Sequence, residues 1–147
     1  MSTCTRPGWL LVGLVWLAGC QTAPESQPEE PLMPSVHYIE IVCEDVDARC
    51  ASLEQIHGLS FGPAVGDLGQ ARVAEAHDGS LIGVRAPLAE HETPIVRTYL
   101  AVDDIAQAIE HAEQAGAIVA YPPTKQGDTG TWAIYVVGGL QFGLWQR

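Results

Sequence analysis

Four polar and aromatic residues on two short alternating stretches have side chains that could do chemistry. Tyr38 and Glu40 stand two residues apart in the first stretch, and Arg97 and Tyr99 stand two apart in the second. Residues two apart in a strand share a face, so each stretch presents one aromatic and one charged side chain together. Such a set is typical of a small-ligand pocket. It equally fits an ion pair in a filled core, with the tyrosines as packing spacers, and the sequence leaves both interpretations open.

Each stretch opens a longer run of elements that occurs twice in the chain. The first unit covers about residues 36–88 and the second residues 94–147. After the opening strand, Asp45 in the first unit and Asp103 or Asp104 in the second stand where a helix N-cap is preferred. Apolar residues then recur at helical spacing, and three shorter strand-like runs complete each unit. The sequence therefore predicts two βαβββ units in tandem.

The last runs of the two units also match each other. Gly79-Ser-Leu-Ile-Gly-Val-Arg-Ala86 aligns with Gly139-Leu-Gln-Phe-Gly-Leu-Trp-Gln146, with the glycines in register. Earlier in the second unit, residues 122–130 begin with two prolines and include two glycines. This composition predicts a long loop between two strands.

Three further motifs carry a resemblance to a known family. They are Val102-Asp-Asp-Ile-Ala-Gln-Ala-Ile109, Gln114-Ala-Gly-Ala117 and Phe142-Gly-Leu-Trp145. Together with the duplicated unit, they resemble the vicinal oxygen chelate superfamily of glyoxalases, bleomycin-resistance proteins and extradiol dioxygenases, over about residues 36–147. The resemblance implies an α+β, glyoxalase-like fold, in which the two units form one curved mixed sheet around a cleft and the helices lie outside.

In metal-using members of that family, the resemblance places the ligands at positions that here hold Tyr38, Ala86, Arg97 and Gln146. The enzymes carry His, Gln or Glu there. Arginine only donates hydrogen bonds, alanine offers no ligand atom, and neutral tyrosine is a poor ligand. Gln146 alone could coordinate a metal, whereas a stable site needs three or four ligands, so we expect neither a metal nor another cofactor. A one-residue bulge would instead bring His37 to the ligand position.

Strand alternation also predicts which residues face the cleft. The last strands are expected to contribute Ile82, Val84, Phe142, Leu144 and Gln146. The expected ligand-binding residues are Tyr38, Glu40, Arg97, Tyr99 and Gln146. They describe an apolar, aromatic-edged cleft with one cation and one carboxylate, as expected of a site for a small molecule.

The charge of the chain limits its partners. The chain has 18 acidic and 7 basic residues. Without Arg6, which lies in the leader, the mature chain has 6 basic residues and a net charge of −12 (6 minus 18). Such a charge opposes binding to nucleic acid and favours cationic ligands or solubility. Arg97 gives the opposite indication, because a buried guanidinium needs a partner and an anionic ligand could supply it; we give this local residue slightly more weight.

The start of the chain is typical of an export signal. Residues 1–19 contain one basic residue and an apolar run that is short for a membrane span. Leu17-Ala-Gly-Cys20 resembles the lipobox of bacterial lipoproteins, which implies cleavage before Cys20 and lipid attachment to its sulfur. Residues 20–35 then predict a flexible tether. The expected location is the bacterial cell envelope, lipid-anchored, and Gln21 favours the outer membrane, facing the periplasm.

Two cysteines remain in the expected fold. Cys43 is expected to point toward the first helix, and Cys50 lies on the inner stripe of that helix. In an oxidising compartment they are either a candidate disulfide, which would pin the helix to its sheet, or two small buried thiols. The sequence favours neither.

These features predict an exported, lipid-anchored protein that binds a small organic ligand in its cleft without a metal, rather than an enzyme. Two alternatives stay open. One is an enzyme of the lyase, isomerase or dioxygenase class, with a shifted metal site or with Glu40 and Arg97 as metal-free electrostatic groups. The other is a structural interaction module with a filled cleft, and a homodimer would fit because family members often pair or exchange units.

Overall fold

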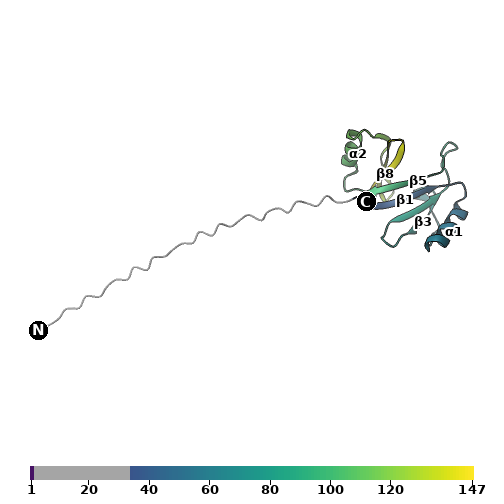
Figure 1. Ribbon diagram of the computed structural model, residues 1–147, viewed down its shortest axis with the longest axis horizontal. Coiled ribbons are helices and arrows are strands. Elements are labelled where there is room, and N and C mark those ends of the chain that lie inside the picture. The colour runs from purple at the N-terminus through teal and green to yellow at the C-terminus, as the bar shows by residue number, and fades with distance from the viewer. Residues whose placement is uncertain (2–33) are drawn as a thin grey trace. The chain divides into compact units, whose positions relative to one another are not determined.

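The computed structural model describes Met1 and residues 34–147 (Figure 1). The predicted signal peptide, the predicted lipidation site Cys20 and nearly all of the predicted tether lie outside the described residues. Neither of the α-helices in the described part is both long enough and apolar enough to cross a membrane.

The first unit begins with a strand and the helix that packs behind it. Its elements are β1 (Val36–Val42), α1 (Val46–His57), β2 (Ala64–Val65), the 3₁₀ helix η1 (Gly66–Leu68), β3 (Ala71–Glu75) and β4 (Leu81–Arg85). The Asp45 side chain accepts a hydrogen bond from the Ala48 backbone N–H at 2.9 Å, which satisfies a donor that has no partner inside the helix. Gly58 ends α1 with a φ of 69°, in the left-handed region. Both predicted ends of this helix are confirmed.

The second unit repeats this order with a longer final hairpin. Its elements are β5 (Ile95–Ala101), α2 (Ile105–Gln114), β6 (Ile118–Gln126), β7 (Gly130–Val137) and β8 (Leu140–Gln146). Asp104 is the N-cap of α2 and accepts from the Gln107 backbone N–H at 3.0 Å. The predicted loop over residues 122–130 is wrong, because most of this segment continues β6. The two prolines fit because β6 is an edge strand, whose ladder to β7 shifts register around them.

The strands form one mixed sheet in the order β2-β3-β4-β1-β5-β8-β7-β6. The two units meet where β1 and β5 pair antiparallel, with Glu40 opposite Arg97 and Tyr38 opposite Tyr99. Within the units, β1 pairs in parallel with β4, and β5 pairs in parallel with β8. Because β1 and β5 belong to the same chain, the joint between the units is made within one molecule, and it carries the residues that the sequence singled out.

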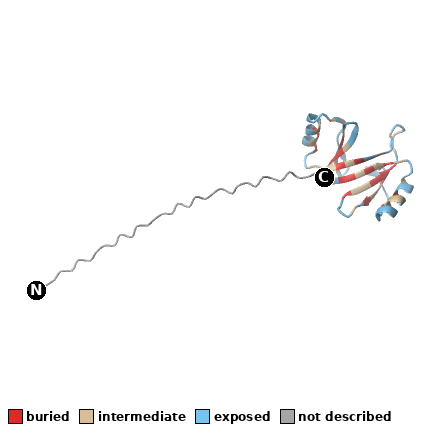
Figure 2. Ribbon diagram, in the orientation of Figure 1, coloured by how far each residue is buried: buried red, intermediate tan, exposed pale blue. Residues whose placement is uncertain are grey.

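The helices pack against one face of this sheet (Figure 1). On α1, Cys50 packs against Val84 of β4 and Phe61. On α2, Ile105 and Ile109 pack against β7 and β8. Figure 2 shows the same division, with buried residues along the strands and exposed residues on the outer sides of both helices. The other face of the sheet carries a separate aromatic cluster, and this face holds the cavity.

Candidate ligand-binding site

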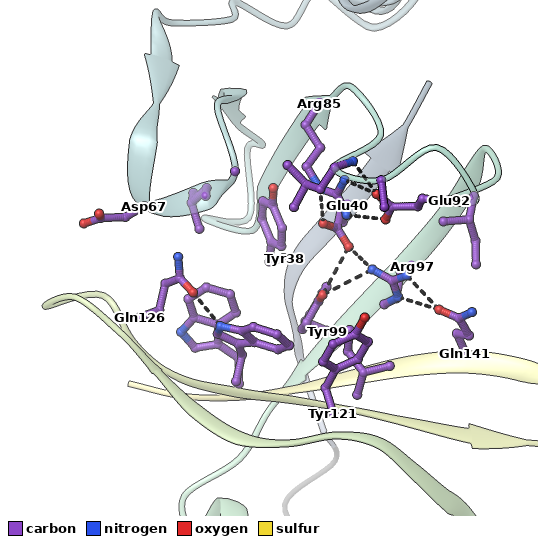
Figure 3. A pocket seen from close by; sticks show the side chains of 18 of the residues that line it. Tyr38, Glu40, Asp67, Arg85, Glu92, Arg97, Tyr99, Tyr121, Gln126 and Gln141 are labelled. Atoms are coloured by element: carbon purple, nitrogen blue, oxygen red, sulfur yellow. Dashed lines mark hydrogen bonds and ion pairs between the residues drawn. The ribbon is translucent and has the colours of Figure 1, made fainter. Parts of the chain in front are cut away.

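A cavity of about 400 Å³ lies over the joint between the two units (Figure 3). Strands β1 and β5 form its centre, η1 and the segment after β4 line it from the first unit, and β6, β7 and β8 line it from the second. The cleft is therefore not a filled core. The polar end, as named below, consists of Glu40, Arg85, Glu92, Arg97 and Gln141. The aromatic end consists of Tyr38, Tyr99, Tyr121, Trp132 and Trp145.

The polar end is built around the buried Glu40 carboxylate, with two buried guanidinium groups beside it (Figure 3). Glu40 Oε1 accepts from Arg85 Nε at 2.6 Å. Its other oxygen, Oε2, accepts from Arg97 Nη1 and from the Tyr99 hydroxyl, the latter at 3.1 Å. The expected pairing of Glu40 with Arg97 is present, and Arg85 extends it into a shared network. Both oxygens of Glu40 are occupied as acceptors.

A second carboxylate and an amide complete the polar end. Glu92 holds Arg85 with both oxygens, at 2.8 Å from Nη1 and 2.6 Å from Nη2, a two-point pairing that fixes the guanidinium plane. The hydrogen bonds from Arg85 lower the pKa of Glu92 to about 2. On the other side, Gln141 Oε1 accepts from Arg97 Nε at 3.1 Å and from Nη2 at 2.7 Å. Every nitrogen of the two guanidiniums is thus engaged.

The aromatic end is a cluster of buried side chains against which two further rings pack. Tyr38, Tyr99 and Trp145 are each less than 5% exposed, and their ring centroids lie 5.6–5.9 Å apart in tilted or edge-on pairs. Trp132 of β7 packs on this cluster, and Tyr121 of β6 lies 5.9 Å from Trp132. Together with Leu68 and Ile134, these rings make this part of the cavity apolar.

Two glycines make room for the tyrosines of this cluster. A Cβ atom at Gly83 would overlap the Tyr38 hydroxyl, and one at Gly143 would overlap the Tyr99 ring. These are the glycines that align between the last strands of the two units. At both places the tyrosine ring lies over bare backbone, a close approach that any larger residue would prevent.

The two buried tyrosines differ in their hydroxyl groups. The Tyr99 hydroxyl donates to Glu40, whereas the Tyr38 hydroxyl is buried and has no hydrogen-bond partner among the described residues. Burial raises the pKa of both phenols above the ordinary value, and the neighbouring Glu40 charge raises it further. Both tyrosines therefore stay protonated and neutral at physiological pH.

Four of the five expected ligand-binding residues line this cavity, namely Tyr38, Glu40, Arg97 and Tyr99. The placement of Gln146 in the cleft is wrong. Its side chain lies on the helix face, where Oε1 accepts from the Ile105 backbone N–H at the start of α2, at 3.1 Å.

The same one-residue error affects the other expected cleft residues of the last strands. Val84 belongs to the cluster beneath α1, and Ile82 packs against that cluster. Leu144 belongs to the cluster beneath α2. Phe142 stacks on Tyr135, which packs against the cluster beneath α2. The cavity is lined instead by Arg85, Gln141 and Trp145. Alternate residues along each strand were assigned correctly to one common face, but that face is the one that meets the helices.

The strand β1 has an irregularity at His37, where a one-residue bulge could bring this residue to a ligand position. The ladder between β1 and β5 shifts register between Val36 and Tyr38, and His37 is buried. Its ring lies 5.2 Å from Trp145, and Nδ1 accepts from Arg147 Nη2 at 2.9 Å. Burial and the Arg147 charge lower the pKa of His37. His37 does not line the cavity, so the bulge does not deliver it to the other candidate ligands.

The residues at the expected metal positions do not fit a metal ion. Arg97 is a cation already paired with Glu40, Ala86 has no donor atom, and Gln146 lies on the opposite face. The Tyr38 hydroxyl is held neutral by burial. In the described part of the chain, no three His, Cys, Asp or Glu side chains are grouped so as to bind a metal. The donor set of this cavity therefore supports no metal-dependent step.

The two cysteines of the fold lie in the same helix-side cluster and are free thiols in this structure. Cys50 is buried, and burial raises the pKa of its thiol. The Cys43 thiol lies 3.5 Å from the Asp45 backbone oxygen, to which it donates. Of the two arrangements left open by the sequence, the structure has two thiols rather than a disulfide.

Comparison with known proteins rests on structure, since no family model and no curated protein matches the sequence. Methylmalonyl-CoA epimerase from Mycobacterium tuberculosis is similar with a TM-score of 0.59 at 16% identity, over 76% of this chain and 87% of that one. The Streptomyces coelicolor epimerase in complex with 2-nitronate-propionyl-CoA gives 0.55 at 16% identity, over 76% and 96%. A hypothetical protein from Bacillus halodurans gives 0.62 at 14% identity, over 78% and 94%.

The fold is glyoxalase-like. The likeness to these structures extends over nearly the whole described part of this chain. The α+β fold predicted from the repeat is thus confirmed. At these identities the likeness concerns the fold, and the function has to be argued from the cavity itself.

Several residues of the cavity were missed in the sequence. Arg85 and Trp145 were assigned to the opposite strand face, and Tyr121 directly precedes the segment expected to be a loop. Glu92 lies between Pro87 and Pro94, where no regular element was expected. The sequence contained one signal for Arg85 and Trp145. These two residues align with each other in the matching last strands, and each directly follows a residue that faces the helices, Val84 or Leu144.

Proposed function

We propose that this protein binds a small organic ligand in the cavity between its two units, without metal chemistry. The observation that carries the proposal is the division of the cavity. Its buried charges already pair with one another, while the rings of the other end line open space. A volume of about 400 Å³ falls in the range of about 300–1,000 Å³ that is usual for small-molecule sites.

Binding is better supported than catalysis by the state of the carboxylates. A general base must have a lone pair within reach of the proton that it removes. Both oxygens of Glu40 accept from arginine or tyrosine donors, and both oxygens of Glu92 accept from Arg85. The pairing with Arg85 lowers the pKa of Glu92 to about 2, which makes it a weak base, and the Glu40 carboxylate is buried between two guanidiniums. We therefore assign the network to holding the shape of the cavity.

The experiment uses the indole N–H signals of the full chain in a non-ionic detergent. The chain has four tryptophans, of which Trp132 and Trp145 line the cavity, while Trp9 and Trp16 lie in the leader sequence. We expect members of a collection of small aromatic fragments to shift the two cavity signals in the presence of a chelator. When the chain is produced as the unprocessed precursor, the leader signals serve as an internal control, and the Trp132→Phe and Trp145→Phe variants assign the spectrum.

Two results would contradict the proposal. One is a collection in which no fragment moves the cavity signals. The other is binding that appears only after a divalent metal such as Mn²⁺, Ni²⁺ or Zn²⁺ is added, which would point to an enzyme of the metal-using type. Shifts that are the same with chelator and with metal support binding without a metal.

We also propose that the protein is exported and anchored by lipid on Cys20, in the outer membrane facing the periplasm. The support is the order of apolar run, Leu17-Ala-Gly and cysteine, followed by a polar stretch that leads to the fold. Growth with an alkyne-tagged palmitate should label the wild-type protein, and Cys20→Ala should abolish the label. Cys4→Ala serves as the matched control. Equal labelling of the Cys20→Ala protein would rule out this anchor.

A further inference from the structure

The charges around the cavity indicate which class of ligand it takes, provided that the proposed binding function holds. Its lining contains three carboxylates (Glu40, Asp67 and Glu92) and two guanidiniums (Arg85 and Arg97), a formal net charge of −1 with neutral histidine. The chain as a whole carries −11. Both the local and the total charge therefore favour a cation over an anion in this cavity.

The cations of the polar end are already paired, which disfavours an anionic ligand there. Arg85 gives Nε to Glu40 and both terminal nitrogens to Glu92. Arg97 gives Nη1 to Glu40, and its Nε and Nη2 edge to the Gln141 amide oxygen. An anionic ligand would compete with these acceptors and would add a negative charge to a buried set that is already neutral. The sequence-based preference for an anion on Arg97 loses its basis, because the residue has found its partners within the chain.

The aromatic end offers the opposite chemistry. Tryptophan and tyrosine rings attract cations through the negative potential of their faces, tryptophan most strongly. Five such rings line this cavity, and two of them, Tyr121 and Trp132, form a pair on the β6–β7 hairpin that lies outside the packed trio of Tyr38, Tyr99 and Trp145. Tyr121 is 56% exposed, so its ring is accessible from solvent.

A carboxylate stands at the edge of this end of the cavity. Asp67 of η1 is exposed and forms no ion pair with any residue in the described part of the chain. It lies against Gly127, in the turn that joins β6 to β7, so η1 and the hairpin approach each other here. In Figure 3 Asp67 and Gln126 lie on one side of the view, and Glu92 and Gln141 lie on the other. The unpaired carboxylate therefore lies on the side of Gln126, which accepts a hydrogen bond from Trp132, whereas Tyr121 lies nearer to Arg97 in the same view.

We propose that the aromatic end binds an organic cation, a quaternary or protonated tertiary amine. Its alkylated nitrogen packs against the rings of Tyr121 and Trp132, and Asp67 adds negative charge at the mouth on the Gln126 side. The paired charges at the polar end keep that wall neutral, so that they do not repel the ligand. This inference names the ligand class of the proposed binding site and depends on that site.

Three probes of similar shape separate charge from apolar burial. They are choline, its neutral carbon isostere neohexyl alcohol, and pivalate, which joins the same branched carbon head to a carboxylate. Titration of the full chain, followed by the indole signals of Trp132 and Trp145, should give a Kd for choline about tenfold lower than for neohexyl alcohol. Pivalate should bind most weakly.

Variants at the two proposed contacts sharpen the test. Tyr121→Leu removes the ring and should weaken choline binding about fivefold, whereas Tyr121→Phe keeps the ring and should change it less than about twofold. Asp67→Asn should weaken choline and leave neohexyl alcohol unchanged. Both positions are exposed and neither side chain has a hydrogen bond in the described structure, so these variants should fold.

The outcomes separate this inference from the proposed function. Equal affinity for choline and neohexyl alcohol, or tighter binding of pivalate, would overturn the cation site and leave a cavity that binds small molecules. Absence of any response to choline would also overturn it, and the fragment collection described above then decides independently whether the cavity binds ligands at all. If Tyr121→Phe weakened choline binding as much as Tyr121→Leu, the ring of Tyr121 would not be the contact for the cation.

Discussion

The two units share one fold but place different side chains at matching positions. In β1 the aromatic residue precedes the charged one (Tyr38, Glu40), and in β5 the order is reversed (Arg97, Tyr99). Antiparallel pairing of these strands therefore puts ring opposite ring and charge opposite charge. The matching last strands repeat the contrast, with Arg85 in the first unit where the second has Trp145. A duplicated scaffold has thus acquired one polar end and one aromatic end.

Because of this difference, we expect the polar end to stabilise the fold and the aromatic end to bind the ligand. At the polar end every buried charge is paired, so it is expected to hold the two units together. At the aromatic end the exposed Tyr121 can meet a ligand, and the unpaired Asp67 lines the cavity on the Gln126 side. Substitutions at the polar end should act mainly on folding, and those at the exposed part of the aromatic end mainly on binding.

The largest effect is expected from Glu40→Gln. The amide cannot balance two guanidiniums whose side chains are only 6–7% exposed, so the free energy of unfolding should fall by about 3–5 kcal/mol. Urea denaturation measures it. Glu44→Gln makes the same change at an exposed carboxylate with no hydrogen bond in the described structure, and it should stay within about 0.5 kcal/mol of wild type. A loss below about 1 kcal/mol for Glu40→Gln would show that the network does not join the two units.

The next largest effect is expected at the glycines beneath the tyrosines. Gly83→Ala and Gly143→Ala each place a methyl group where a tyrosine now lies, and overpacking of this kind typically costs about 1–3 kcal/mol. Gly143→Ala should be the more damaging, because it meets the body of the Tyr99 ring, whereas Gly83→Ala meets the hydroxyl end of Tyr38. Thermal unfolding of both variants checks the order. Unchanged stability in both would mean that the rings do not lie over these strands.

A smaller effect separates the two buried tyrosines. Tyr99→Phe removes a donor to Glu40 and should lower the free energy of unfolding by about 1 kcal/mol. Tyr38→Phe removes a hydroxyl that has no partner among the described residues, so stability should stay within about 0.5 kcal/mol of wild type or rise. Urea denaturation measures both variants, and each serves as the control for the other because both lose one buried hydroxyl. A larger loss for Tyr38→Phe than for Tyr99→Phe would reverse the assignment.

The smallest effect is a change in acid sensitivity at the polar end. Arg85 lowers the pKa of Glu92 to about 2, from an ordinary value of 4.5. The unfolded chain therefore takes up this proton at higher pH than the folded chain. The stabilisation is present above pH 4.5 and is lost as the pH falls toward 2. The stability difference between wild type and Glu92→Gln should shrink across this range in urea denaturation, and a constant difference would contradict the pairing.

Much of the fold was predictable because its signals are local. Asp45 and Gly58 bound the first helix by their own side-chain and backbone preferences, and the alternating runs 36–42 and 95–101 are strands wherever they pair. The extension of β6 through Pro122 and Pro123 was not predictable, because prolines favour a loop unless the segment happens to be the edge of a sheet.

The site was predictable only in its centre. Glu40 and Arg97 are polar residues within apolar strands, so their pairing follows from alternation. Alternation did not reveal which face of β4 and β8 lines the cavity, because Ile82 and Val84 are as suitable for a cleft as for a core packed against a helix. Arg85 was the informative residue in that strand, since a buried guanidinium needs a carboxylate and only the cavity face offers one.

The central claim is that a ligand enters at the aromatic end while the polar end stays paired. The most direct measurement is the set of nuclear Overhauser contacts between the N-methyl protons of bound choline and protein side chains. We predict contacts to the rings of Tyr121 and Trp132. Contacts to Ile95 and Leu88 beside Arg85 and Arg97, with none to these rings, would contradict the account.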